Sequence, residues 1–414
     1  MKSLKYIILT VLLVATFITC TACGAGSMES VVNEVSEVAV DETFAETKEE
    51  TNAEVVTVEE PTLFVEPEVD LLMVGDILLH DNVQNSGKLP DGTYNYDHLF
   101  ANVIEEVQAA DIAIANQEVI LGGVELGLSG YPRFNGAYEV GDALVKAGFD
   151  VILHATNHTM DKDKEGLVNC MNFWKENYPE VAVLGVFDSQ ESYDHDIYIY
   201  EEDGLKIAIL NYTYGTNGLP VPSDMPYAVA MLEKEKVIGD LQKAEEIADF
   251  TVVCPHWGIE YQHKQSEEQR EWAEIFMENG ADLVIGAHPH YIQPIEMMTG
   301  DNGEEMLVYY SLGNFINSTS DSGRGTADRM IGGMAKVTIA KTEEGEAYIK
   351  TYGVEPLVTQ LLYGPQQITT YLLAEYTEEL AAENKIIEKD EIFNMTYCHN
   401  LVEEVFGTHA LSCQ

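Results

Sequence analysis

The stretch "VDLLMVGD", Val69–Asp76, is an apolar run of strand length that ends in a carboxylate. Beyond it, apolar runs of similar length alternate with amphipathic segments of helical length, as far as "EMLVYYSLG" at residues 305–313. The alternation of such runs is typical of an α/β fold, in which helices connect successive strands of a sheet. The alternation of strand-length and helix-length segments that begins at Val69 therefore predicts an α/β fold.

Polar side chains follow five of the predicted strands. The residues are Asp76 after "LLMVG", Glu118 after "IAIANQ", Asn157 and His158 after "VILHAT", His256 after "TVVCP", and His288 with His290 after "LVIGA". Ligands of open α/β sheets gather in the crevice outside the carboxyl ends of the strands. We therefore expect these side chains, which are far apart in sequence, to converge on one edge. A single histidine after a strand is more often structural, but five coincidences favour a shared site.

The converging residues have the composition of a metal site. Their side chains offer imidazole, carboxylate and one amide but no thiolate, a donor set that suits Mn, Fe or Zn better than calcium. In an extended chain the side chains at positions i and i+2 point to the same side. His288 and His290 could thus each serve one of two adjacent ions, and Glu118 is the natural carboxylate to bridge them.

Charge and composition limit the possible partners. The chain has 414 residues, 46% of them apolar, which is ample for a sizeable core. Its 22 basic and 71 acidic residues give a formal net charge of -49. This balance argues against a nucleic-acid partner and against non-specific affinity for anionic lipid. An anionic substrate would need local positive charge at its site, which a metal ion could supply.

Residues 1–23 are typical of an export signal. Lys2 and Lys5 precede an uninterrupted apolar run, and the sequence then reads "CTACGAG". The "TAC" triplet resembles the lipobox of bacterial lipoproteins, which makes Cys23 the expected lipidation site; Cys20 is the lesser candidate, and ordinary secretion is the alternative. We expect a protein that is lipid-anchored at the extracytoplasmic face of a bacterial cell membrane, or otherwise secreted.

Residues 24–68 predict an acidic, disordered tether. The segment is rich in Glu, Asp, Ser, Thr and Pro, and its valines show no sustained period. Such a composition offers too little apolar surface to offset the entropy of ordering the chain. The tether would hold the folded part away from the membrane.

Six blocks then carry a family resemblance: "VGDILLH", "IANQE", "ATNHTMD", "PHWGIEY", "GAHPHYIQ" and "YSLGNF", in that order. They resemble the signature blocks of the CapA family of capsule-synthesis proteins, named for poly-γ-glutamate capsule production. The family is similar to the calcineurin-like metallophosphoesterases, which implies a four-layer α/β/β/α sandwich. We place this domain at residues 69–325. Residues 326–414 contain a predicted strand pair and an acidic helix, which we expect to complete the second sheet or flank the domain.

The resemblance also implies roles for the strand-end residues. Asp76, Asn157, His256, His288 and His290 match metal ligands of the family, and Glu118 takes the place of the bridging acid. His158 matches the histidine that contacts substrate and can protonate a leaving group. The first block departs from the phosphoesterase pattern, because Leu78 stands where a histidine is expected. His80 either substitutes for that ligand or is a simple loop histidine.

Other residues of the matching blocks are expected to support this site. Asp161 would hold His158 in place, as histidines at metal sites usually require. Glu260 and Trp257 could line a substrate groove, although packing is an equal alternative for Trp257. Asn314, with Ser311, is expected to fix the loop beside the metals and border the substrate. Arg133 is a candidate clamp for an anion, and a surface salt bridge is its alternative.

The implied function is that of an exported, membrane-anchored protein with a metal-dependent hydrolase-type site. It would act in the synthesis, release or attachment of an anionic surface polymer such as poly-γ-glutamate, and hydrolysis of a phosphoester or an amide is chemically open to such a site. The alternative is a non-catalytic component of a capsule assembly complex that binds the polymer or membrane capsule-synthesis subunits.

Overall fold

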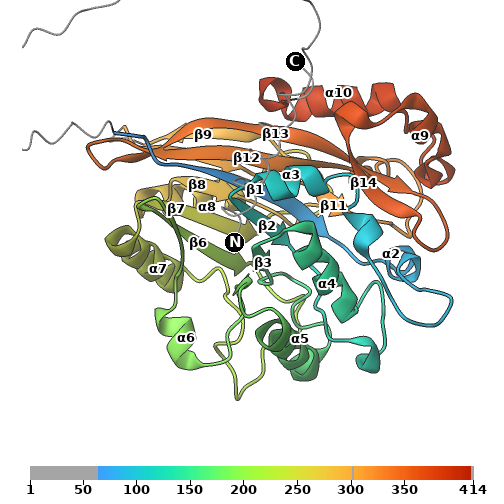
Figure 1. The fold of residues 1–414 in the computed structure, drawn as a ribbon, viewed down its shortest axis with the longest axis horizontal. Coiled ribbons are helices and arrows are strands. Elements are labelled where there is room, and N and C mark those ends of the chain that lie inside the picture. Colours follow the sequence, from blue (N-terminus) through green and yellow to red (C-terminus); the bar gives the residue numbers. More distant parts are fainter. Residues whose placement is uncertain (1–63, 301–302, 412–414) are drawn as a thin grey trace, which may run out of the picture. The chain divides into compact units, whose positions relative to one another are not determined.

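The computed structural model describes residues 64–300 and 303–411. The predicted export signal, Cys23 and most of the predicted tether lie outside these residues and stay predictions. From Phe64 onward the described chain belongs to one compact unit that contains two β-sheets (Figure 1).

The first sheet is built around β1, the strand that contains the opening stretch. Its order is β14-β13-β12-β1-β2-β3-β4, with β11 paired to β1. The strands β1 to β4 and β11 run parallel, whereas β12, β13 and β14 are antiparallel additions. Their bounds are β1 Glu68–Ile77, β2 Ile112–Asn116, β3 Val151–Leu153, β4 Ala182–Leu184, β11 Asn314–Ile316, β12 Ile331–Lys341, β13 Ala347–Leu361 and β14 Ile368–Leu372.

The second sheet has the order β5-β6-β7-β8-β10-β9. Its inner strands β6, β7, β8 and β10 are parallel, and β5 and β9 pair antiparallel at the two edges. The bounds are β5 Tyr198–Glu202, β6 Leu205–Thr213, β7 Phe250–His256, β8 Leu283–Ile285, β9 Ile295–Thr299 and β10 Glu305–Tyr309.

Alternate residues of the second sheet enter two different cores, because successive side chains of a strand point to opposite faces. Ile207 and Ile209 belong to the large cluster shared with the first sheet. Leu210 and Tyr212 of the same strand pack in a smaller cluster with residues of α7 and α8. The two sheets therefore pack against each other through one face, and helices cover the other face of the second sheet.

Helices also cover the first sheet, so the molecule has four layers. Val140 and Leu144 of α4 and Leu167 of α5 are buried in the large cluster. The predicted four-layer α/β/β/α sandwich is confirmed. The helices are α2 Asp81–Ser86, α3 Ile104–Ala109, α4 Tyr138–Ala147, α5 Asp163–Asn177, α6 Gln190–His195, α7 Lys234–Ile247, α8 Glu267–Glu278, α9 Glu378–Glu383 and α10 Met395–Val405.

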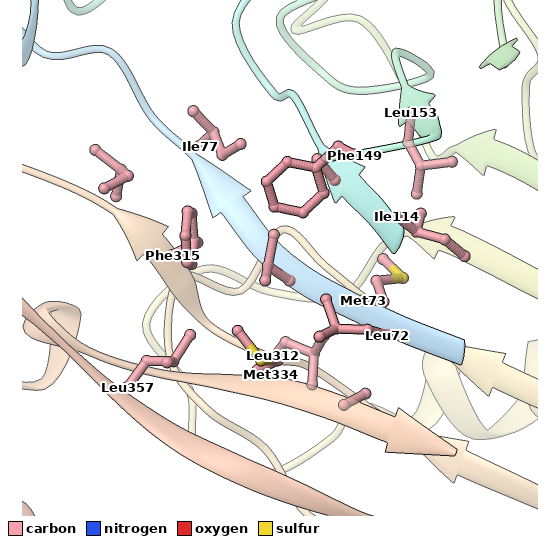
Figure 2. Close-up of a cluster of buried hydrophobic side chains, with 14 of the residues drawn as sticks. Leu72, Met73, Ile77, Ile114, Phe149, Leu153, Leu312, Phe315, Met334 and Leu357 are labelled. Atoms are coloured by element: carbon pink, nitrogen blue, oxygen red, sulfur yellow. The ribbon is translucent and has the colours of Figure 1, made fainter. Parts of the chain in front are cut away.

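Figure 2 shows the part of the large cluster that surrounds β1. The ring of Phe315 lies in the same cluster as Ile77, and its centroid is 6.4 Å from that of Phe149. Leu312 and Met334 lie on the same side of the β1 ribbon as Phe315, and Phe149 lies on the other side. Every residue of β1 from Leu71 onward is buried, which explains why Leu71–Val74 is apolar without alternation, whereas Glu68 and Asp70 at the start of the strand are exposed.

The end of β1 lies against the chain segment that crosses from the second sheet to the first. This segment leaves β10 after Tyr309 and enters β11 at Asn314, and Gly313 O accepts a hydrogen bond of 2.9 Å from Asp76 N. A Cβ atom on Gly75 would lie 2.0 Å from the same carbonyl oxygen. Only glycine permits this approach, so Gly75 is part of what holds the site-bearing ends of the two sheets together.

The C-terminal segment differs in part from its prediction. The strand pair of residues 331–361 is present, but it extends the sheet that contains β1 and not the second sheet. The acidic helix predicted from "TTYLLAEYTEELAAEN", residues 369–384, begins too early, because Ile368–Leu372 forms strand β14 and the helix α9 covers only Glu378–Glu383. The physical reason is pairing: the segment "ITTYL" bonds to the long strand β13, which outweighs its local helical pattern.

Within the described part of the chain, no helix combines the length and the apolar composition that a membrane-crossing helix needs.

Substitution of Gly75 by alanine should destabilise the protein by about 1–3 kcal/mol, because the added methyl group overlaps a backbone oxygen in a packed interior. Denaturant unfolding of the purified protein measures this change. The matched control is Gly239→Ala in α7, where an added Cβ meets no atom within 4 Å. That variant should be unchanged or gain roughly 0.5–1 kcal/mol from the removal of a helical glycine. Equal stability of the two variants would contradict the role given to Gly75.

Candidate metal centre

The predicted site residues come together, but at the junction of two sheets and not at the edge of one. Asp76, Glu118 and Asn157 follow or end strands of the first sheet, whereas His256 and His288 follow or end strands of the second. The expectation of a single sheet edge is therefore wrong. The carboxyl ends of the inner strands of both sheets lie at this junction. The rule that ligands bind outside the carboxyl ends of parallel strands therefore still locates the site.

The carboxylate of Asp76 connects the two sheets. It is fully buried, and its oxygens accept hydrogen bonds of 3.1 and 3.3 Å from the backbone N–H of His288. Asn116 Nδ2 donates to Oδ1 at 2.7 Å, and His290 Nδ1 lies 3.1 Å from Oδ2. The carboxyl group at the end of β1 is therefore hydrogen-bonded by residues of both sheets.

Glu118 lies at the centre of the site. Its side chain is fully buried, and neither carboxylate oxygen has a hydrogen-bond partner. Three imidazole nitrogens face it at longer distances: His256 Nε2 at 3.7 Å and His158 Nε2 at 3.9 Å from Oε1, and His290 Nδ1 at 3.7 Å from Oε2. An unbonded buried carboxylate is costly in a protein interior. A cation held between these groups would remove that cost, so the residues fit a metal site.

The potential ligand atoms form two groups that share Glu118. One group is Glu118, His256 and His288, and the other is Asp76, Glu118 and His290; the ligand atoms within each group lie within 4.8 Å of one another. Asn157 Oδ1 adds a further oxygen 3.0 Å from His256 Nε2. The two groups have the membership that a Glu118 bridge would need, with His288 in one and His290 in the other; the bridge and the two ions stay predictions.

The backbone of the "HPH" segment is not extended, contrary to the expectation from its spacing. His288 has φ of 99° and His290 has φ of 58°, values that side-chain-bearing residues rarely adopt. Strand β8 has already ended at Ile285. The bend is held by the Asp76 carboxylate, which binds His288 N, and such strain commonly occurs at functional sites that the surrounding structure holds in place.

Burial and charge set the protonation of these groups. Burial, followed by the charges of neighbouring histidines, lowers the pKa of His256 and of His288 well below the ordinary value. Both imidazoles are therefore neutral at pH 7 and available as ligands, and the Nδ1 atom of each is buried without a partner. Burial raises the pKa of Glu118. For His290, burial opposes protonation, but the charges of Glu118 and Asp76 outweigh it and raise its pKa to about 9.

His158 and Asp161 form a hydrogen-bonded pair beside the two ligand groups. His158 Nδ1 lies 2.6 Å from Asp161 Oδ2, which also accepts a 2.6 Å bond from the backbone N–H of Phe134. The ring of Phe134 packs edge-on against His158 with centroids 4.7 Å apart. The expectation that Asp161 holds His158 agrees with this geometry. With Nδ1 bonded to the carboxylate, the Nε2 atom of His158 faces Glu118.

Leu78 stands where the phosphoesterase pattern has a histidine, and its side chain is part of the apolar core. His80 does not take the place of that histidine. His80 belongs to neither of the two ligand groups, and its ring packs edge-on against Phe134 with centroids 5.2 Å apart. Burial, and then the charge of His290, lowers the pKa of His80 to about 3.

Two predicted substrate residues have other roles. Trp257 is 1% exposed and packs on Phe276, while its Nε1 donates to Tyr310 O at 3.0 Å. Of the two alternatives given for Trp257, packing describes its position, because its ring lies on the helix-covered face of the second sheet. Asn314 is also buried and bonds both to His290 Nδ1 and to His290 O, at 3.1 and 3.2 Å. It therefore positions a ligand instead of bordering a substrate.

The remaining predicted residues lie around the site. Glu260 is exposed, and its charge contributes to the raised pKa of both Glu118 and His290. Ser311 Oγ accepts a 3.1 Å bond from Gly313 N, which fixes the crossing loop as expected. Arg133 forms a surface ion pair of 3.1 Å with Asp163, so the alternative given for this residue describes its contact in the structure.

Three residues that contact the site were not singled out in the sequence. Asn116 bonds to Asp76. The ring of Tyr214 lies 4.6 Å from that of His288, and Asn217 lies 3.5 Å from both the Asn157 amide and His158 Nδ1. Asn116 could have been found, because it ends strand β2 just before Glu118. Tyr214 and Asn217 follow strand β6, and residues 214–217 contain no histidine or carboxylate that would draw attention to this strand end.

Comparison with known families identifies relatives along most of the described chain. A family model described as "Bacterial capsule synthesis protein PGA_cap" matches residues 70–319, more than half of the 414 residues. The PGA biosynthesis protein CapA of Bacillus subtilis (strain 168) is 32% identical over 170 residues, which cover 41% of this chain and 42% of that protein. The capsule biosynthesis protein CapA of Bacillus anthracis is 26% identical over 259 residues, which cover 59% of each chain. The chain thus matches about half the length of these curated relatives.

Solved structures are more distant. The NAD nucleotidase of Haemophilus influenzae is 13% identical, covers 84% of this chain and 65% of its own, and superimposes with a TM-score of 0.45. The calcineurin-like phosphoesterase YfkN of Bacillus subtilis is 13% identical, covers 82% of this chain and 99% of its own, and gives a TM-score of 0.44.

Metal analysis of purified variants tests the two ligand groups. Wild-type protein supplied with Mn, Fe or Zn should retain about two ions per chain. Glu118→Gln should lose both, because the side chain belongs to both groups, whereas His288→Ala and His290→Ala should each lose about one. The control is His195→Ala on the exposed side of α6, which should retain the wild-type content. Wild-type content in Glu118→Gln would contradict the shared bridge.

Proposed function

Because the chain belongs to the family of bacterial capsule synthesis proteins described as PGA_cap, we propose that it acts in capsule or poly-γ-glutamate polymer synthesis, release or attachment. The proposed activity is metal-dependent hydrolysis of a phosphoester or an amide bond. The proposed location is the extracytoplasmic face of the cell membrane, with Cys23 as the lipid anchor.

One observation carries the proposed activity: the Glu118 carboxylate is buried and unbonded among three imidazole nitrogens at 3.7–3.9 Å. A structural carboxylate in such a place would have hydrogen-bond donors or an adjacent ion pair of short distance. The spacing of these groups leaves room for cations between them, and the two candidate ligand groups share this one side chain. This is the arrangement expected of a carboxylate that bridges two metal ions.

The chemistry divides between the metal ions and the His158 pair. Two divalent ions bound at this site would supply Lewis-acid activation of a phosphoryl or carbonyl oxygen and of a water molecule. His158 can hold or transfer a proton at Nε2, since its Nδ1 is engaged by Asp161 at 2.6 Å. Asp161 is a positioning residue in this scheme. It keeps the ring oriented and is itself held by Phe134 N.

The strongly negative charge of the chain is compatible with an anionic polymer as substrate only if the polymer is bound at a local site of positive charge. A net charge of -49 repels anions over most of the surface. A metal centre at the junction of the sheets would be a strong local source of positive charge. Membrane subunits of a capsule assembly complex are the proposed protein partners, with no nucleic acid involved.

A second function is favoured by the composition of the ligand group that contains His290. Leu78 is buried where the phosphoesterase pattern has a histidine, and His80 does not join the group. This group therefore has one imidazole with two carboxylates, a poorer donor set than that around His256 and His288. A protein with one weakly held ion would bind polymer carboxylates without turnover, as a non-catalytic component of polymer assembly.

Turnover measurements distinguish the two functions. The metal-loaded protein is assayed against a phosphomonoester, a phosphodiester and a γ-glutamyl amide. His158→Asn should reduce kcat by about 10²–10⁴-fold, the usual contribution of general acid–base catalysis, with metal content unchanged. Asp161→Asn should lower kcat less, because the ring is retained but loses the partner that orients it.

The control variant is His409→Ala, whose ring stacks on that of Tyr352 and which belongs to neither ligand group. It should keep the wild-type rate. Equal turnover in wild-type protein and His158→Asn would exclude His158 as the proton donor. No turnover of any substrate by wild-type protein with full metal content would favour the non-catalytic function.

A further inference from the structure

A further strand ends in polar residues at the same junction. Strand β11 runs parallel to β1, with Asp76 opposite Asn314 and Ile77 opposite Ile316. The residues that follow it are therefore on the same side as those that follow β1. They are Asn317, Ser318 and Thr319, and each is at most 2% exposed. None of them has a role in the two ligand groups or in the proposed proton transfer.

Three buried polar atoms of this strand end and of Arg329 have no partner within the described chain. Asn317 Oδ1, Ser318 Oγ and Arg329 Nε are buried and have no hydrogen-bond partner. Asn317 Nδ2 makes only a long contact of 3.5 Å, with Arg329 O. Buried polar groups are nearly always bonded in folded proteins, so ordered water or a ligand is expected to satisfy these atoms. Two of them, the guanidinium N–H of Arg329 and the hydroxyl of Ser318, are donors toward an anion.

Two sets of contacts connect Arg329 to the candidate metal centre, one through Asn314 and one through Tyr261. Asn314 Nδ2 donates to Arg329 O at 3.0 Å, while Asn314 Oδ1 lies 3.1 Å from His290 Nδ1. The guanidinium carbon of Arg329 lies 3.9 Å from the ring centroid of Tyr261. The ring of Tyr261 is in turn 5.8 Å from that of His290 and is partly exposed. The arginine therefore lies beside the part of the site that contains His290.

Arg329 differs from the other arginines of the chain. There are four in total. Arg133 and Arg270 form ion pairs with Asp163 and Glu296 and have half-exposed side chains, and Arg324 is exposed. The Arg329 side chain is 12% exposed. In a chain with 71 acidic residues, a largely buried guanidinium is a local source of positive charge, and Lys389, whose Nζ donates to Thr319 O at 2.6 Å, adds a second one nearby.

We propose that Arg329, together with Ser318 and Asn317, forms an oxyanion-binding subsite next to His290, where the protein recognises a carboxylate or phosphate group of its substrate. The proposal deepens the proposed function and rests on it for the identity of the substrate. A guanidinium binds such planar or tetrahedral oxyanions with paired N–H donors, which an ammonium cannot reproduce. Ser318 Oγ would donate a further hydrogen bond. The Asn317 amide can turn its NH₂ group toward an anion, because its present contact is long.

Asp321 forms an ion pair with the guanidinium group of Arg329. Arg329 Nη1 donates to Asp321 Oδ2 at 2.8 Å and to Thr319 Oγ1 at 2.7 Å. The Asp321 side chain is 62% exposed, so its ion pair with Arg329 is partly solvated and weak. An incoming oxyanion would replace this carboxylate. Removal of the Asp321 charge should therefore strengthen anion binding, and removal of the Arg329 charge should weaken it.

Calorimetric binding to the metal-loaded whole chain tests the subsite. The probes are a γ-glutamate oligomer and inorganic phosphate, which distinguish a carboxylate ligand from a phosphate ligand. Arg329→Ala should weaken binding of the recognised probe by about tenfold or more, the loss expected for a charge-assisted hydrogen bond. Asp321→Asn should strengthen it, Ser318→Ala should weaken it by a smaller factor, and the matched control Arg133→Ala should have the wild-type affinity.

Metal content and thermal unfolding are measured on every variant, so that loss of the metal or of the fold is recognised. The subsite would be overturned if Arg329→Ala bound both probes with wild-type affinity. It would also be overturned if wild-type protein bound neither probe. Weaker binding in both Arg329→Ala and Asp321→Asn would also overturn it, because the ion pair would then act only by holding the loop. Intact probe binding without turnover would count against hydrolysis but support the subsite.

Discussion

The structure depends on the buried carboxylate of Asp76 at the place where the two sheets meet. A charge in a protein interior must be bonded from its surroundings, and here the donors come from both sheets: Asn116 on one side, the backbone of His288 and the ring of His290 on the other. The same strand end binds Gly313 of the crossing segment, an approach that only Gly75 allows. The ends of the sheets are therefore held in one arrangement, and the site residues inherit that arrangement.

This constraint explains why the histidine backbone is strained. The segment from His288 to His290 adopts positive φ at both histidines because it must direct one N–H and two rings toward groups that are already fixed. Asn314 bonds the ring and the backbone of His290 and so supports the bend from the opposite side. Strain of this kind is retained where the surrounding structure determines it, and it pre-organises ligands instead of leaving them to rearrange.

Charge is distributed unevenly between the surface and the site. The surface of a chain with a net charge of -49 repels anions, whereas the junction of the sheets contains the neutral imidazoles of His256 and His288, the unbonded carboxylate of Glu118 and one largely buried guanidinium. Such a site combines places for cations with a separate place for an anion. Specificity for an anionic polymer can then be local, and does not require attraction by the protein as a whole.

The sequence by itself determined the fold class and the set of residues that converge, because strand period and strand-end polarity are local properties that survive in any α/β packing. It identified Asp76, Glu118, Asn157, His256, His288 and His290 without knowledge of their neighbours. Only the tertiary structure decided that these residues come from two sheets, that Trp257 is packed under helices, and that Arg329 and not Arg133 lies beside the site. The physical reason is that sheet pairing and burial arise from contacts between distant segments, such as β11 with β1, which no local pattern in either segment encodes.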